Sequence, residues 1–179
     1  MHETSEHRAL LVVDVQTGLF SPSSPKLKNA TGLLGRITEL IGRARQRGTP
    51  VIYTQFGGPS GTPLELDSPA AAIHPSVAPR EDELVIHKDD SDAFLRTDLA
   101  ERLKELGVET LIVCGLQSEF CVDSTCRTAY ALGYQVVLVE DGHTTTDSDT
   151  LTGAQIADHH NRTLSRAYVT LSRAADVFE

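Results

Sequence analysis

Long hydrophobic runs are absent from this sequence of 179 residues. The longest apolar stretches, such as residues 9–13, are much shorter than the roughly 20 residues that a transmembrane helix requires. The first eight residues are polar and contain no apolar segment of the kind found in a signal peptide. We therefore expect no membrane partner and a cytoplasmic location.

Positive charge is scarce as well. The chain has 16 lysine and arginine residues against 25 aspartate and glutamate residues, which gives a net charge of −9. Such an acidic protein is unsuited to nucleic acid or anionic lipid, so we expect neither as a partner. The length and the 40% hydrophobic content fit one domain over residues 1–179, with residues 1–8 as a flexible tail.

Cysteine is rare, and its spacing excludes two kinds of structural site. Cys114, Cys121 and Cys126 are an odd number of cysteines, form no C-x-x-C pair and have no zinc-finger spacing to histidine. A disulfide framework or a structural zinc site is therefore not expected. Cys114 lies in an apolar stretch and Cys126 within an expected helix, so we interpret both as packed core residues.

Short β-branched stretches alternate with helical stretches along the chain. The expected strands are Ala9–Val15, Pro50–Phe56, Glu83–His87, Thr110–Cys114, Gln135–Val139 and Ala167–Leu171. The expected helices are Asn29–Arg47, Arg96–Leu106, Cys121–Leu132 and Thr152–Leu164. This alternation predicts the α/β class, as a three-layer α/β/α arrangement around a mostly parallel sheet.

Residues 57–80 break this alternation. They hold five of the eight prolines and three of the 13 glycines. Too little chain precedes them for a separate domain, which disfavours an interdomain linker. Ordered loops of this length are uncommon without a function, so we expect a long loop near the active site.

Three reactive side chains fall where expected strands end. Asp14 lies near the end of the first strand, Lys88 directly follows the third, and Cys121 follows the fourth and a short loop. Because ligands of open parallel sheets bind beyond the carboxyl ends of the strands, the three are expected to meet. Each alone has an ordinary explanation, as a loop-capping aspartate, a surface lysine or a packed helical cysteine.

Together the three residues match the needs of nucleophilic catalysis. Cys121 would begin a helix, where the dipole and unpaired N–H groups favour a thiolate and can stabilise an oxyanion. Lys88 would lower the pKa of the thiol further. Asp14 would take the thiol proton and then pass it to a leaving nitrogen. We therefore expect an ionised sulfur in the resting protein.

Four stretches carry a resemblance to a known family: Leu11–Gln16, His87–Lys88 with Phe94, Cys114–Val122 and Gly133–Gly142. They resemble the isochorismatase-like cysteine hydrolase superfamily, which includes nicotinamidases and N-carbamoylsarcosine amidohydrolases. The similarity runs from about Leu10 to His160. It implies a Rossmann-like, six-stranded parallel sheet and assembly as a homodimer or a higher homo-oligomer.

The resemblance also implies the roles of individual residues. Asp14, Lys88 and Cys121 correspond to the catalytic triad of the superfamily. A cis peptide bond is expected between Leu116 and Gln117, and the backbone amides of Gln117 and Cys121 would form the oxyanion hole. Candidate substrate-binding residues by position in the motifs are Leu19, Phe20, Phe94 and Phe120, each of which can equally be core.

Two departures from the family pattern narrow the interpretation. Isochorismatases proper lack the nucleophilic cysteine, so Cys121 favours acyl transfer from an amide-like substrate. Metal-dependent nicotinamidases carry an Asp-x-His pair after the second strand, whereas residues 53–58 contain neither residue. We therefore expect no metal and no cofactor. His143 follows the fifth strand within reach of the pocket rim, and His159 and His160 are interpreted as structural.

The main functional hypothesis is a cysteine-dependent amidohydrolase. A small amide, ureide or carbamoyl compound would be its partner molecule, cleaved through a thioester on Cys121. One alternative is the same triad acting on an ester, a lactam or an antibiotic ring. A second alternative, from another functional class, is a redox-sensing or ligand-binding module that uses Cys121 without turnover.

Overall fold

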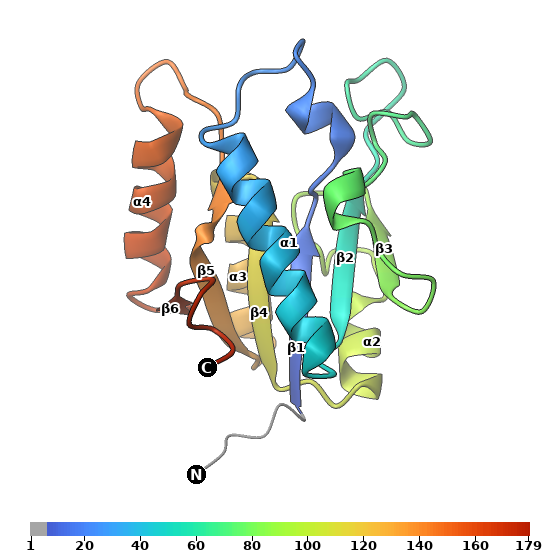
Figure 1. Cartoon of the computed structure of the whole chain (residues 1–179), viewed down its shortest axis with the longest axis vertical. Coiled ribbons are helices and arrows are strands. Elements are labelled where there is room, and N and C mark those ends of the chain that lie inside the picture. The colour runs from blue at the N-terminus through green and yellow to red at the C-terminus, as the bar shows by residue number, and fades with distance from the viewer. Residues whose placement is uncertain (1–6) are drawn as a thin grey trace.

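The computed structural model describes residues 7–179, and its six strands form one sheet with helices on both faces (Figure 1). The strands are β1 (Arg8–Val13), β2 (Val51–Phe56), β3 (Leu84–Lys88), β4 (Thr110–Leu116), β5 (Gln135–Thr144) and β6 (Thr170–Ser172). The helices are α1 (Ala30–Gln46), α2 (Leu99–Glu105), α3 (Asp123–Ala131) and α4 (Gly153–Leu164). The predicted α/β class and six-stranded sheet are confirmed.

All neighbouring strands are parallel, in the order β3-β2-β1-β4-β5-β6. The chain moves outward from β1 to β3 on one side and then returns to place β4 on the other side of β1. An order that reverses in this way leaves a crevice beyond the carboxyl ends of the two central strands. The fold therefore opens a ligand site next to the ends of β1 and β4.

Two hydrophobic clusters cover the two faces of the sheet. Helix α1 lies across one face, in front of β1 and β4 in Figure 1, and its apolar side includes Leu33, Ile37 and Leu40. Helices α2 and α3 cover the opposite face, where Leu103 and Cys126 pack against the alternate side chains of β1 and β4. Because β1 and β4 are buried on both faces, their sequences are apolar almost throughout.

Some element bounds differ from those expected. Strand β5 continues through His143 to Thr144, five residues beyond the predicted end, because the residues after Gly142 pair with the end of β4. The predicted tail is wrong at His7 and Arg8, since Arg8 begins β1 and the carbonyl of His7 accepts from the amide of Glu109. The rest of that tail, residues 1–6, lies outside the described residues.

The long segment between β2 and β3 is held close to the strand ends. Gln16 and Ile73 form an antiparallel bridge, and Gly58 and Glu65 form a second bridge within the segment. The segment includes one short helical turn, Pro75–Val77. Within residues 7–179, no helix has both the length and the apolar character needed to cross a bilayer.

The central strands approach most closely at Gly115 in β4. Its φ is +125°, and a Cβ there would collide with the carbonyl oxygen of Val13 in β1. Only glycine permits this approach, which sets the separation of the two strand ends that carry Asp14 and the loop to Cys121.

We expect Gly115→Ala to lower the free energy of unfolding by about 3 kcal/mol or more, because the new methyl group meets backbone rather than movable side chain. The control is Gly42→Ala in α1, where a Cβ would meet no atom within 4 Å. That change should raise the free energy of unfolding by about 1 kcal/mol. Urea denaturation measures both, and equal stability of the two variants would contradict the prediction.

Candidate active site

The three reactive residues predicted from the sequence meet at one end of the sheet. The Nζ atom of Lys88 lies 2.7 Å from Oδ2 of Asp14 and 3.4 Å from Sγ of Cys121. The side chains of Lys88 and Asp14 are 0% and 3% exposed, so the ion pair is shielded from water. The structure therefore places an ammonium between a carboxylate and a thiol beyond the ends of β3, β1 and β4.

Asp14 is held by the backbone and side chain of the neighbouring strand. Its φ of +48° turns the chain sharply after β1, a conformation that aspartate tolerates better than most residues. Oγ1 of Thr54, in β2, donates to Oδ1 of Asp14 at 2.6 Å and also accepts from the Asp14 amide. One carboxylate oxygen is thereby occupied by Thr54, and the other faces Lys88.

Lys88 reaches the site from two strands away. Strands in a sheet lie about 4.8 Å apart, so its long side chain must cross the end of β2 to meet Asp14. It passes the aromatic ring of Phe56, whose centroid is 5.2 Å from Nζ. Nζ also donates to the carbonyl of Asp90 at 2.8 Å, which fixes the ammonium in place.

Cys121 lies on a tight turn between β4 and α3. The peptide bond between Leu116 and Gln117 is cis, and residues 118–122 form a single π-helical turn before the α-helix begins at Asp123. The amides of Phe120 and Val122 both donate to the carbonyl of Gln117, at 3.1 and 3.2 Å. The turn thus keeps Cys121 close to the end of β4.

The expectation of an ionised sulfur in the resting protein is wrong. The pKa of the Cys121 thiol is raised to about 12, first by burial and then by the negative charge of Asp14. Lys88 acts in the expected direction and lowers the pKa, but its effect is smaller. A thiol with so high a pKa is protonated at neutral pH.

An apolar pocket of about 450 Å³ adjoins these residues. It is lined in part by Phe56 below Lys88 and by Gln117 and Phe120 from the turn that carries Cys121. Leu19, which was predicted to bind substrate, also lines it, and Phe120 is 53% exposed there.

Two of the predicted substrate-binding residues lie elsewhere. Phe20 packs against His74, with ring centroids 4.9 Å apart, and contributes to the cluster beneath α1. Phe94 stacks on Tyr134 on the opposite face of the sheet. Both are partly buried side chains packed against the core, because their position in a motif fixes their place along the chain but not the direction of the side chain.

Comparison with known proteins identifies the family. Residues 8–170 match the isochorismatase domain. This chain belongs to the isochorismatase family. A crystal structure of an isochorismatase from Pseudomonas putida KT2440 superimposes with a TM-score of 0.90 at 32% identity, covering 96% of this chain and 90% of that chain.

Two relatives of this isochorismatase-family chain have named activities. Streptothricin hydrolase from Streptomyces noursei is 41% identical over 78% of this chain, which spans 50% of that protein. Maleamate amidohydrolase from Pseudomonas putida is 28% identical over 74% of this chain and 70% of that protein. The chain therefore belongs to a family of hydrolases, and it spans about half the length of the streptothricin hydrolase that it matches.

Gln16 supports the site and was not singled out from the sequence beyond its place in a motif. Its Nε2 donates to the carbonyls of Phe56 and Ala71 at 2.8 and 2.7 Å, and its Oε1 accepts from the Phe56 amide. This fully buried amide joins the end of β2 to the long loop. Its effect is to hold Phe56 between Lys88 and the apolar pocket.

A second support, also missed from the sequence, lies behind the turn that carries Cys121. Asn161 of α4 donates to the carbonyl of Glu140, so its Oδ1 faces Nε2 of His143 at 2.9 Å. Nε2 must then carry the proton, and Nδ1 accepts from the Ser118 hydroxyl at 2.8 Å. Burial lowers the pKa of His143, which keeps the ring neutral.

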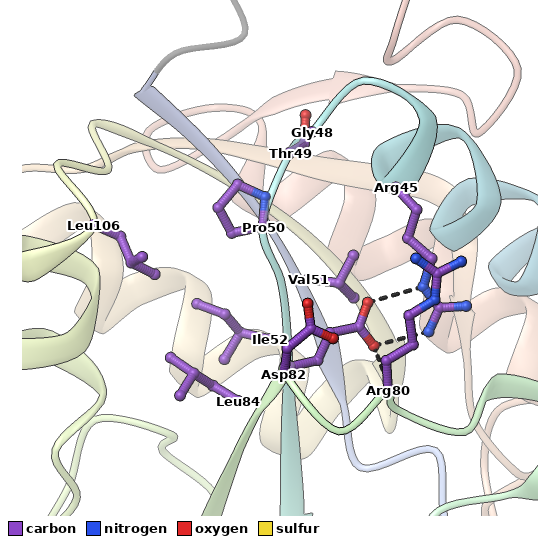
Figure 2. A pocket seen from close by; sticks show the side chains of 11 residues that line it. Arg45, Gly48, Thr49, Pro50, Val51, Ile52, Arg80, Asp82, Leu84 and Leu106 are labelled. Atoms are coloured by element: carbon purple, nitrogen blue, oxygen red, sulfur yellow. Dashed lines mark hydrogen bonds and ion pairs between the residues drawn. The ribbon is translucent and has the colours of Figure 1, made fainter.

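A pocket of about 240 Å³ at the other end of the sheet has no comparable chemistry. It lies at the start of β2 and β3, where Arg45 makes two contacts of 2.8 Å with Glu83 (Figure 2). The amide of Arg80 donates to the same carboxylate. Because Arg45 and Glu83 satisfy one another, we interpret this pair as structural.

No group of three or more histidine, cysteine, aspartate or glutamate side chains is arranged to hold a metal ion within residues 7–179. Cys114 and Cys126 are fully buried on opposite faces of the sheet, as predicted for packed residues. Burial raises the pKa of both thiols.

We expect native protein to show no thiolate absorbance at 240 nm between pH 7 and 9, because the pKa of Cys121 is raised to about 12. Asp14→Asn should move the titration of Cys121 to lower pH by removing a negative charge, while Lys88→Met should move it higher. Difference spectra against Cys121→Ser isolate this thiol from the tyrosines. A thiolate signal at pH 7 in the unmodified protein would contradict the assignment.

We also expect His143 to make the fold sensitive to acid. Its folded pKa is lowered below the ordinary value of 6.5, so the unfolded chain takes up the proton first and stability falls as pH drops below about 6.5. Urea denaturation at pH 7.5 and pH 5 should show a larger loss for the natural protein than for His143→Asn. His159→Gln, on the exposed side of α4, is the control and should retain the full loss.

Proposed function

We propose that this protein is a cysteine-dependent hydrolase of small amide, ureide or carbamoyl compounds. The observation that carries the proposal is the buried contact of Lys88 with both Asp14 and Cys121, beside an apolar pocket of about 450 Å³. A nucleophile, a proton acceptor and a fixed positive charge then lie in one place, as covalent acyl transfer requires.

In the first step, Sγ of Cys121 attacks the carbonyl carbon of the substrate while its proton passes to Asp14. Because the resting thiol is neutral, proton transfer accompanies attack. As the proton leaves, negative charge develops on the sulfur, which lies next to the ammonium of Lys88. Asp14 becomes neutral at the same time, and Lys88 remains in contact with it. The backbone amides of Gln117 and Cys121 hold the oxyanion.

In the second step, the tetrahedral intermediate collapses and Asp14 gives its proton to the departing nitrogen, leaving a thioester on Cys121. Asp14 then removes a proton from water, which attacks the thioester carbonyl. The carbon–sulfur bond breaks, the acid is released and the proton on Asp14 returns to sulfur. The triad ends each cycle in its starting state.

The relatives support hydrolysis in general and amide hydrolysis in one case. Maleamate amidohydrolase is named for the cleavage of an amide, and streptothricin hydrolase for a different substrate. The name streptothricin hydrolase supports the alternative, in which the same triad acts on an ester, a lactam or an antibiotic ring. A redox-sensing role is disfavoured, because sensor cysteines have lowered pKa values and Cys121 has a raised one.

The proposal is tested by trapping the thioester. The protein is incubated with a panel of small amides, ureas and carbamates, ammonia release is measured, and samples quenched in acid are analysed by intact-protein mass spectrometry. We expect ammonia release with one acyl group on Cys121, and a loss of kcat/KM of about a thousandfold or more in Cys121→Ser and Asp14→Asn.

Cys126→Ala is the matched control, since it removes a buried thiol of the same helical region that lies outside the site. It should keep its activity and its adduct. Undiminished turnover in Cys121→Ser would falsify the proposed mechanism, and oxidation of Cys121 without any acyl adduct across the panel would favour the sensing alternative.

A further inference from the structure

We propose that the site selects uncharged substrates that carry a hydrocarbon group and rejects carboxylates and cations. This inference rests on the proposed acyl transfer at Cys121 and concerns what the neighbouring pocket admits. The part of the structure that carries it is the pocket wall, which is mostly apolar and includes no charged side chain among its lining residues.

The wall is built from segments that are far apart in the sequence. Leu19 and Leu27 come from the segment between β1 and α1, Phe56 from the end of β2, Leu64 from the long loop and Phe120 from the turn after β4. The polar members include Gln117 and Thr146, which carry no charge. Such a cavity binds hydrocarbon by removing it from water and gives a bound ion no counter-ion.

Two acidic residues that neighbour the pocket wall in sequence hydrogen-bond elsewhere. Glu65 sits beside Leu64, but its two oxygens accept from the Ser60 hydroxyl at 2.7 Å and the Gly61 amide at 3.0 Å. Asp147 follows Thr146, yet its Oδ1 accepts from the Gly153 amide at 2.7 Å. Neither carboxylate lines the pocket, so neither is placed to bind a cationic substrate.

Glu119 and two lysines are likewise outside the wall. Oε1 of Glu119 accepts from the Thr145 hydroxyl at 2.8 Å, and Oε2 is buried with no hydrogen-bond partner among the described residues. Lys26 and Lys28 are exposed on either side of Leu27, which is only 8% exposed. The alternation along this segment points the leucine inward and leaves both ammonium groups in water.

The loop that supplies Leu64 is held by its own backbone hydrogen bonds. The amide of Gly58 donates to the carbonyl of Leu64 at 2.7 Å, and the amide of Leu66 donates to the carbonyl of Gly58 at 3.1 Å. This pairing closes the loop of residues 58–66 on itself and fixes Leu64 against the pocket. Binding therefore does not require the loop to fold, and its apolar selectivity is built into the resting structure.

The pocket borders the turn that carries the sulfur. Gln117 and Phe120 belong to the same turn as Cys121, and Phe56 lies between the pocket and the ammonium of Lys88. Lys88 itself does not serve as an anion receptor, because Asp14 already lies 2.7 Å from it. A substrate carboxylate would meet no free cation on this path.

Alkylation of Cys121 tests the selectivity without any need for turnover. Four reagents are compared: iodoacetamide, N-benzyliodoacetamide, iodoacetate and a trimethylammonioethyl iodoacetamide. Rates at Cys121 are measured by peptide mass spectrometry and divided by the rate of each reagent with glutathione. A salt concentration of about 0.3 M screens the long-range effect of the net charge of −9.

We expect the benzyl reagent to exceed iodoacetamide by on the order of tenfold after this division, and both charged reagents to fall below iodoacetamide by a similar factor. Leu64→Lys should raise the relative rate of iodoacetate and lower that of the benzyl reagent. Leu132→Lys is the control, because it adds the same charge at an exposed side chain just past the end of α3, outside the pocket. It should leave all four relative rates unchanged.

Equal relative rates for neutral and charged reagents in the natural protein would overturn the inference, and so would a preference for either ion. These rates decide the matter even if Leu64→Lys does not fold.

Ammonia release from phenylacetamide and 4-carboxyphenylacetamide then separates the two proposals. Selective alkylation with no hydrolysis of any amide would sink the proposed reaction alone, whereas hydrolysis of both amides at equal rates would sink the selectivity alone.

Discussion

The buried ion pair between Asp14 and Lys88 is the interaction on which the rest of the site depends. Removing either partner from such a pair leaves an uncompensated charge and typically costs about 3–5 kcal/mol, so its retention in the interior needs support from the surrounding structure. That support is visible on both sides. Thr54 occupies the second oxygen of the carboxylate, and the carbonyl of Asp90 accepts from the ammonium. Cys121 is the one reactive group added to this arrangement, and its pKa is raised first by burial and then by the negative charge of Asp14.

The sheet topology explains why the pair forms where it does. β1 and β4 are the central strands, and the close approach at Gly115 brings the end of β1 beside the start of the turn that holds Cys121. Lys88 comes from two strands away and has the reach that a shorter side chain would lack. The opposite end of the sheet has charged residues as well, but Arg45 and Glu83 satisfy each other there (Figure 2).

Local sequence patterns were sufficient to predict that these strands and helices exist and that Asp14, Lys88 and Cys121 follow strand ends. Some bounds were wrong: β6 is Thr170–Ser172 rather than Ala167–Leu171, and α3 begins at Asp123 rather than at Cys121. The patterns did not reveal the groups that hold those residues. His143 and Ser118 are 25 positions apart, and only the extension of β5 beyond its predicted end brings them together. The predicted charge state of the Cys121 sulfur was also wrong. The helix dipole that favours a thiolate can be inferred from the order of elements along the sequence, whereas the desolvation of the thiol depends on its surroundings in the folded protein.

Charge neutrality connects the triad to the pocket beside it. In the resting state the carboxylate, the ammonium and the neutral thiol carry no net charge, and moving a proton from sulfur to Asp14 leaves that sum unchanged. The proposed reaction would therefore move charge between neighbouring groups without creating any net charge in the buried site. A charged substrate group would upset this balance, since the apolar wall has nothing to offset it. The same low polarity that keeps the thiol protonated thus also favours neutral substrates.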